Sequence, residues 1–174
     1  GGAAEAGGKG DNMVVVVGRE GLGKSTFFRL LAGSENFNDT KPDLESKDAY
    51  LQLQGAWFFE WGEIETIVRR SDVARVKSFL SSQVDKYRAP FARTVQAHPR
   101  RGIIVGSSNS HDLIQDLDSN RRYWIFEIED AVDLPWVREH RDQLWAEALE
   151  AYAAGESWFL TTEQEAARRE VNET

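Results

Sequence analysis

Short runs of apolar residues recur along this chain and are separated by longer segments of mixed polarity. Residues 13–17, 56–59 and 102–105 are almost entirely apolar, and many of their side chains are β-branched or aromatic. Runs of this length and composition are typical of strands that are buried on both faces of a parallel sheet. Residues 123–128 predict a fourth strand, because Trp124, Phe126 and Ile128 alternate there with Ile125, Glu127 and Glu129.

The segments between these strands have the spacing of amphipathic helices. A helix is expected from about residue 24 to residue 31, with Gly33 as a left-handed C-cap, and a further helical segment is expected at 47–54. Ser71 is expected to cap a helix over 72–82, because the apolar residues there recur at helical spacing. Buried strands that alternate with helices predict an α/β fold with a mainly parallel sheet flanked by helices.

One long helix is expected near the C-terminus. Asp133 has the properties of its N-cap, Pro135 falls in its first turn and Gly155 follows its end. Its apolar stripe comprises Val137, Leu144, Trp145, Ala148, Leu149 and Tyr152. Thr162 and Glu165 have the spacing of a capping box, which predicts a short terminal helix.

The length of 174 residues suits a single ordinary domain. Residues 1–12 are rich in glycine and are expected to be a flexible linker or a cloning scar, residues 13–160 form the core domain, and residues 161–174 form an acidic tail or short helix. No run of 18 apolar residues occurs and no signal-like N-terminal segment is present. We therefore expect a cytoplasmic protein without a membrane partner.

Charge is distributed unevenly along the chain. The formal net charge is -8, yet the segment from Arg69 to Arg101 holds nine basic residues against two acidic ones. Such a run is usually a solvated face, and the alternative is a surface that contacts nucleic acid. The chain has no cysteine, which excludes disulfides, thiolate zinc sites and cysteine nucleophiles, and its three histidines lack metal-ligand spacing.

The segment after the first expected strand matches the phosphate-binding pattern G-x-x-x-x-G-K-[ST] in full. In such a loop, backbone N–H groups curve around phosphate oxygens and the following helix N-terminus adds its positive dipole end. Lys24 is expected to hold the β- and γ-phosphates of ATP, and Ser25 to coordinate Mg²⁺. The candidate nucleotide-binding residues are Gly18, Arg19, Glu20, Gly21, Leu22, Gly23, Lys24, Ser25 and Thr26.

A site of this kind requires an acid at the end of a neighbouring strand, to orient Mg²⁺ and to activate water. Glu60 and Glu63 follow the second expected strand. We assign Glu60 to the metal side and Glu63 to the activation of water. The reverse order, or one residue with both roles, remains an alternative.

Three further polar residues are candidates for the same chemistry. Asn109 follows the third strand, where it can contact the γ-phosphate or the attacking water, or can simply cap the next turn. Arg121 and Arg122 precede the fourth strand. Either guanidinium can act as a finger on the phosphate of a neighbouring subunit, and the alternative is that the pair anchors the strand that starts at Tyr123.

Six segments follow one another along the chain, namely GREGLGKST, GAWFFEWGE, VKSFLSSQVDKYRAPFAR, RRGIIVGSSN, NRRYW and RDQLWAEALEAY. Their order resembles the virulence-associated E family of phage- and island-encoded proteins, which is similar to the superfamily 3 helicases within the AAA+ ATPases. The likeness covers about residues 13–165. In one departure, Trp61 follows Glu60 where many relatives of the wider superfamily carry paired acids.

The resemblance implies a P-loop ATPase that uses ATP and Mg²⁺, assembles as a ring, expected to be a hexamer, and moves along single-stranded or forked DNA during mobile-element replication. It implies that a primase or origin-binding domain is a partner, and that the nucleic acid lies against Lys77, Lys86, Arg88 and Arg93. The competing hypothesis is an ATP-gated DNA-binding or assembly module that does not unwind DNA. A GTP switch or a small-molecule kinase is a third reading, and the absence of an N-K-x-D motif weakens the GTP switch.

Overall fold

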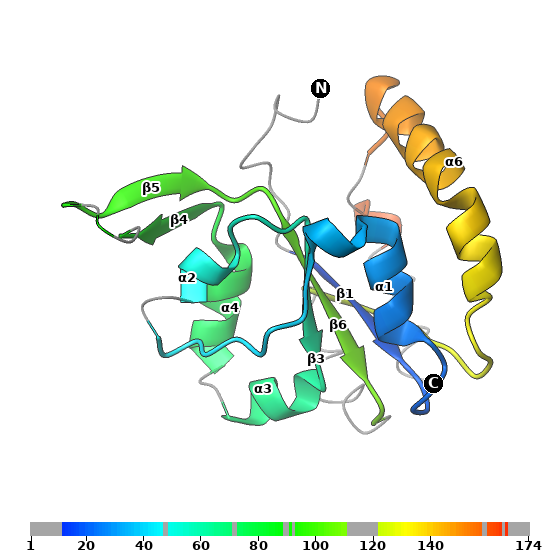
Figure 1. Cartoon of the computed structure of the whole chain (residues 1–174), viewed down its shortest axis with the longest axis horizontal. Helices are drawn as coiled ribbons and strands as arrows, with labels where there is room; N and C mark the ends of the chain where they lie inside the picture. The colour runs from blue at the N-terminus through cyan, green and yellow to red at the C-terminus, as the bar shows by residue number, and fades with distance from the viewer. Residues whose placement is uncertain are drawn as a thin grey trace.

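The computed structural model describes residues 12–46, 49–70, 73–88, 91, 93–110, 122–157, 160–164 and 166. At its centre lies a five-stranded parallel sheet with the strand order β2, β3, β6, β1, β7 (Figure 1). The strands are β1 (Met13–Val17), β2 (Phe37–Asn38), β3 (Phe58–Gly62), β6 (Ile103–Ser108) and β7 (Tyr123–Glu127). The predicted α/β fold with a mainly parallel sheet is confirmed.

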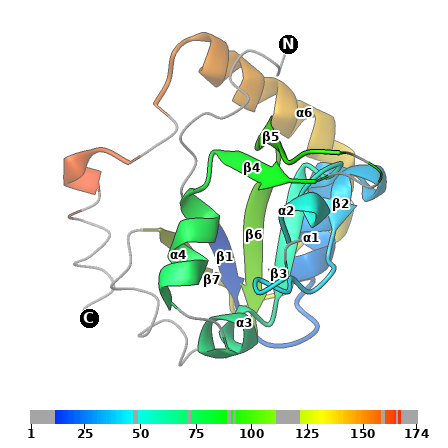
Figure 2. The same cartoon turned by 90° about the vertical axis from the view of Figure 1, so that its left-hand side faces the viewer.

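Helices cover both faces of this sheet. One face carries α1 (Lys24–Ala32) and α6 (Leu134–Ala153), and the other carries α2 (Ala49–Gln52), α3 (Ile64–Arg70) and α4 (Val73–Ser81), as Figure 2 shows from the side of α4. A 3₁₀ turn, η1 (Ser34–Asn36), follows α1.

Side chains of β1 alternate between the two resulting cores. Val15 packs with Phe79 of α4, while Val16 packs with Phe28 of α1. An apolar strand that is covered on both faces is what the run at 13–17 predicted.

Two strands extend further than the sequence predicted. β3 ends at Gly62 rather than at residue 59, so that Glu60 lies inside the strand, and β6 ends at Ser108 rather than at residue 105. Glu60 is paired with Val105 and Gly62 with Ser107. The backbone ladder continues through these polar residues because it does not depend on side-chain polarity.

A second sheet projects from the body of the molecule (Figure 1). It is an antiparallel hairpin of β4 (Val84–Tyr87) and β5 (Gln96–Pro99), which the sequence did not predict. The residue after β5 anchors it, because Nη2 of Arg100 lies 2.7 Å from Oδ1 of Asp85 and Nη1 donates to the Phe79 carbonyl oxygen at 2.7 Å. The Asp85 side chain is fully buried and that of Arg100 is 9% exposed.

Helix ends differ from the predictions in detail. α1 ends at Ala32, and Gly33 has φ 85° and ψ 141°, which is a glycine-favouring conformation but not the expected left-handed helical one. A capping box joins Thr161 and Gln164, since the backbone N–H of Thr161 donates to Oε1 of Gln164 and the backbone N–H of Gln164 donates to Oγ1 of Thr161. Ser71, Glu165 and residues 1–11 of the expected linker lie outside the described residues.

The long helix α6 begins as predicted, with a carboxylate oxygen of Asp133 accepting a hydrogen bond from the backbone of Trp136. Its apolar stripe is only partly covered, since Val137 is buried whereas Leu149 is 64% exposed. No helix in the described part of the chain is long and apolar enough to cross a membrane.

Candidate functional site

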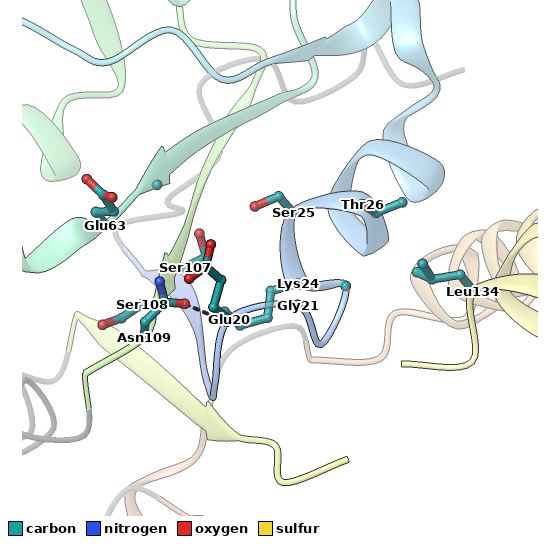
Figure 3. Close-up of a pocket in the computed structure, with 12 residues that line it drawn as sticks. Glu20, Gly21, Lys24, Ser25, Thr26, Glu63, Ser107, Ser108, Asn109 and Leu134 are labelled. Carbon is teal, nitrogen blue, oxygen red and sulfur yellow. Dashed lines mark hydrogen bonds between the residues drawn. The ribbon is translucent and has the colours of Figure 1, made fainter. Parts of the chain in front are cut away.

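The loops that follow β1, β3 and β6 meet at one edge of the sheet, which we call the carboxyl edge because these parallel strands all end there. Between them lies a cavity of about 440 Å³ (Figure 3). It is lined by Glu20, Gly21, Gly23, Lys24, Ser25, Thr26, Gly62, Glu63, Ser107, Ser108, Asn109 and Leu134. Ligands of open α/β sheets bind at this edge of the strands.

The glycine-rich loop (residues 18–25) has a conformation that needs its glycines. A Cβ atom on Gly18 would lie 2.5 Å from the carbonyl oxygen of Ile128, so that a side chain there would clash with backbone. Gly21 and Gly23 have φ values of 83° and 87°, which disfavour other residues. A Cβ at Gly23 would also meet Leu134, whereas the space around Gly21 is open. Gly21 and Gly23 line the cavity, so the loop presents backbone rather than side chains there.

Lys24 begins α1, and its ammonium group is held by three oxygen atoms. Nζ donates to the carbonyl oxygens of Gly18 and Arg19 at 2.6 and 2.7 Å, and to Oδ1 of Asn109 at 2.8 Å. The residue is 7% exposed. Burial lowers the pKa of the Lys24 ammonium, while the carboxylates of Glu20 and Glu60 act in the opposite direction.

Glu60 is buried beside two hydroxyl groups. Its Oε1 accepts hydrogen bonds from Oγ of Ser25 and from Oγ of Ser107, both at 2.6 Å. The bonds tie α1, β3 and β6 together at a single oxygen atom. Sequence reasoning missed Ser107, although two serines at the end of an apolar strand were a visible indication.

Glu63 differs from Glu60 in almost every respect. It is exposed, and Oε2 lies 3.0 Å from Nζ of Lys41 in an exposed ion pair. Its φ of 51° is unusual for a residue with a side chain. The positive φ lets the chain leave β3 and start α3 at once, with the Glu63 carbonyl oxygen accepting from the backbone of Thr66. Glu63 therefore lines the cavity without a buried partner of its own.

The other nucleotide-binding candidates divide into two groups. Glu20 and Thr26 line the cavity with Lys24 and Ser25. Arg19 is exposed, and its guanidinium lies 3.5 Å from the Glu129 carbonyl oxygen. Leu22 is 8% exposed and fixes the loop, since its carbonyl oxygen accepts from the backbone of Val132. The structure therefore divides the predicted nucleotide-binding residues into those that line the cavity and those that support the loop.

Arg122 lies at the opposite edge of the sheet, which we call the amino edge. It precedes β7, and its Nε donates to Oγ of Ser81 at 3.0 Å. Five strand residues of about 3.3 Å each separate this edge from the glycine-rich loop, so Arg122 does not reach the cavity of its own chain. Arg121 lies outside the described residues.

The four candidate nucleic-acid residues are all exposed and lie away from the cavity. Lys77 is on α4, and the hairpin and its turn carry Lys86, Arg88 and Arg93. Arg100, which the charge count placed in the same basic segment, is instead buried with Asp85. Because Asp85 belongs to the same segment, burial of the pair leaves the net charge of the segment unchanged, but one basic residue fewer is available at the surface.

The oxygen ligands around the cavity suit a hard divalent cation. Among the described residues, no group of three or more histidine, aspartate or glutamate side chains is arranged to hold a metal ion by itself. Ser25 and Glu60 nevertheless place a hydroxyl and a carboxylate oxygen 2.6 Å apart. Mg²⁺ is commonly held in this way, with one carboxylate, water and phosphate oxygens as its ligands. These two residues fit the ion when phosphate supplies the remaining oxygens.

Comparisons with known proteins agree with this architecture. The sequence model of the virulence-associated protein E-like domain matches residues 2–174. None of the curated proteins compared with the chain matches it. The apo A form of the NrS-1 C-terminal region (residues 305–718) has a similar fold, with a TM-score of 0.52 and 15% sequence identity. The similarity covers 95% of this chain and 34% of that one, so this chain corresponds to about a third of the NrS-1 region.

Proposed function

Since the chain belongs to the virulence-associated protein E-like domain family, we propose that it is the ATP-hydrolysing motor core of a superfamily 3-like DNA helicase or translocase that acts in mobile-element replication. One observation carries this proposal. Lys24 and Ser25, at the end of the glycine-rich loop, line one cavity, and each is hydrogen-bonded to a residue from a distant part of the sequence, Lys24 to Asn109 and Ser25 to Glu60. That combination fits a phosphorylated ligand and a divalent cation.

Binding of the triphosphate is proposed to be an exchange of partners at Lys24. The ammonium gives up carbonyl and amide oxygens for β- and γ-phosphate oxygens, and the N–H groups at the start of α1 face the same anion. Asn109 is then released to contact the γ-phosphate or the attacking water. Mg²⁺, held by Ser25 and Glu60, would neutralise charge on the phosphates.

Glu63 is the proposed acceptor of the proton from the attacking water. The water oxygen forms a bond to the γ-phosphorus, the bond from that phosphorus to the β-phosphate oxygen breaks, and the water proton moves to the carboxylate. Glu63 must leave Lys41 to reach this position, and its exposed ion pair is weak enough to allow it.

Arg122 and Arg121 are proposed to complete the site of a neighbouring subunit in a ring. The position of Arg122 at the amino edge supports this reading, because it is too far from the cavity of its own chain. Mixing Lys24→Ala subunits with Arg121→Ala/Arg122→Ala subunits should restore hydrolysis where an intact loop meets an intact arginine. If the mixture assembles and stays inactive, the pair only anchors β7, as the bond from Arg122 to Ser81 alone would suggest.

The hairpin of β4 and β5 is the proposed contact with single-stranded DNA. Its strands and turn carry Lys86, Arg88 and Arg93, all exposed. Replacing these three by alanine should flatten the dependence of log affinity on log salt by up to about 0.7 per lost phosphate contact. Arg138→Ala, which removes an exposed cation on α6, is the control. An unchanged slope in the triple variant would identify the hairpin as a solvated face.

Two measurements test the whole proposal. The first is the rate of ATP hydrolysis with and without single-stranded DNA, and the second is the mass of the particle in the presence of a nonhydrolysable ATP analogue. Stimulation by DNA and a ring-sized mass are expected. Lys24→Ala should lose tight triphosphate binding and keep its fold. Assembly with ATP but without DNA-stimulated turnover would favour the ATP-gated assembly module, and wild-type ATP affinity in Lys24→Ala would contradict the phosphate site.

A further inference from the structure

A second cavity, of about 400 Å³, lies at the amino edge of the sheet. There the turn after α2 passes beside the link from β5 to β6 (Figure 1). Its walls include Gln54, Gly55, Trp57, His98, Pro99 and Arg101. Trp57 directly precedes β3 and Glu63 directly follows it, so five strand residues, or about 17 Å, separate this cleft from the first cavity. The amino-edge cleft is therefore a separate site.

Trp57 presents its indole ring to the surface from a fixed backbone. The residue is 53% exposed, although the backbone is bonded on both sides. Its N–H donates to the Asn36 carbonyl oxygen at 2.7 Å, and its own carbonyl oxygen accepts from Ile103 at 2.8 Å. Gly102 lets the backbone before β6 pack closely against the backbone before β3, because a Cβ there would lie 2.5 Å from the Ala56 carbonyl oxygen. An exposed aromatic ring on a rigid strand end is a suitable stacking platform.

The polar walls of the cleft favour an anionic ligand. Arg101 is exposed, and no acidic residue lies among the described lining residues. His98 stacks on Tyr87, with ring centroids 4.3 Å apart, and its buried Nε2 has no hydrogen-bond partner among the described residues. A buried ring nitrogen without a partner can be satisfied by a ligand or a water molecule.

The hairpin connects this cleft to the proposed contact with nucleic acid. Pro99 is paired with Val84, and Lys86 lies two residues further along β4, so Pro99 and Lys86 are on the same face of the hairpin. A polymer that follows the exposed cations of the hairpin along this face arrives at Pro99 and then at Arg101.

We propose that the amino-edge cleft binds one nucleotide of a single-stranded nucleic acid, with its base stacked on Trp57 and its phosphate against Arg101. Every nucleobase has a π-face, so the stack selects single strands over duplexes without selecting a sequence. The inference rests on the proposed function in one respect, namely that this chain binds nucleic acid.

The test is equilibrium binding of labelled oligothymidylate and oligouridylate to the full chain. ATP is left out, so that binding at the cleft is measured apart from any binding or hydrolysis of triphosphate at the first cavity. Trp57→Ala should weaken binding at least about fivefold, since stacking contributes about 1–3 kcal/mol per base. Trp57→Phe should retain most of the affinity, because the ring remains. Arg101→Ala should reduce the salt slope by about 0.7. Trp136→Ala, which removes a half-exposed tryptophan from α6, is the matched control.

A photo-crosslinking experiment on the wild-type chain tests the cleft even if one of the variants fails to fold. An iodouracil-substituted oligonucleotide bound to the wild-type chain should crosslink to the peptide that contains Trp57, in its DNA form, its RNA form or both. If binding is weakened by the hairpin variant but not by Trp57→Ala, and the crosslink lies elsewhere, the cleft proposal is wrong while the proposed function stands. If neither oligonucleotide binds at low salt, nucleic-acid binding fails, and this inference with it.

Discussion

The two edges of the central sheet handle charge in opposite ways. At the carboxyl edge, Lys24 and Glu60 are buried and already hydrogen-bonded to neighbouring oxygen atoms and hydroxyl groups. At the amino edge, Trp57 and Arg101 are exposed, and the one buried ion pair described there, Arg100 with Asp85, holds the hairpin in place. Buried charges require fixed partners, which suits a small ligand held in one geometry, whereas exposed groups can adapt to a polymer.

The largest expected effect is on turnover at the carboxyl edge. Glu63→Gln should bind ATP normally and hydrolyse it about 10²- to 10⁴-fold more slowly, because an amide cannot accept the proton. Glu60→Gln should also weaken the dependence on Mg²⁺, since it removes a ligand charge beside Ser25. Glu20→Gln, which alters another carboxylate of the same cavity, is the control. Normal hydrolysis by Glu63→Gln together with an inactive Glu60→Gln would reverse the two roles.

The next largest effect is on stability beside the amino edge. Arg100→Ala should destabilise the fold by about 3–5 kcal/mol, because it leaves the Asp85 carboxylate buried without its partner. Denaturant unfolding measures the change, and Asp85→Leu combined with Arg100→Met should recover much of it. Arg101→Ala is the matched control, expected to change stability by less than about 0.5 kcal/mol. Equal effects of the two arginine variants would contradict the difference in burial.

At alkaline pH, a group at each edge should change the stability of the fold, and the two changes should have opposite signs. Burial raises the pKa of Tyr123, at the amino edge, from 10.0 to about 12. The unfolded chain loses this proton first, so stability falls between pH 10 and 12, by about 2–3 kcal/mol in total. The lowered pKa of Lys24 acts oppositely, with stability rising as pH approaches 10.5 from below.

Unfolding as a function of pH is the measurement of this difference. Tyr123→Phe should remove the alkaline loss, while Tyr152→Phe, at a half-exposed position of α6, should leave it unchanged. A persistent loss in Tyr123→Phe would assign the alkaline titration to another group.

The smallest effect concerns an exposed ion pair at the carboxyl edge. Lys41 and Glu63 are each 58% exposed at the side chain. Lys41→Ala should therefore change the free energy of unfolding by no more than about 1 kcal/mol, and turnover by no more than about fivefold. Loss of hydrolysis in this variant would mean that Lys41 contacts the nucleotide. Exposed charges would then matter for the small ligand at the carboxyl edge as well as for a polymer at the amino edge.

The sequence predicted what depends on local pattern. The apolar run at 13–17, the glycine-rich loop and the cap at Asp133 are each determined by a few consecutive residues. The structure contains all three. Lys24, Ser25, Glu60 and Asn109 were also identified from short motifs and do come together. Motifs specify local conformation, and a parallel sheet then brings the strand ends to one edge.

What the sequence did not predict depends on pairing between distant residues. The hairpin was missed because β5 reads Gln-Ala-His-Pro, which has little strand character without β4 as its partner. Ser107 and Lys41 acquire their roles only through Glu60 and Glu63, far away in sequence. Counting charges treated Arg100 like its neighbours, whereas burial against Asp85 separates it from them.

The three oxygen atoms around Lys24 have a consequence that calorimetry can detect. An ammonium group in water must shed its hydration before it can bind an anion, but here folding has already replaced that water with the oxygens of Gly18, Arg19 and Asn109. An incoming anion therefore exchanges one set of acceptors for another. The heat released at this residue should therefore be small, because each new hydrogen bond to phosphate replaces one that the folded protein already makes.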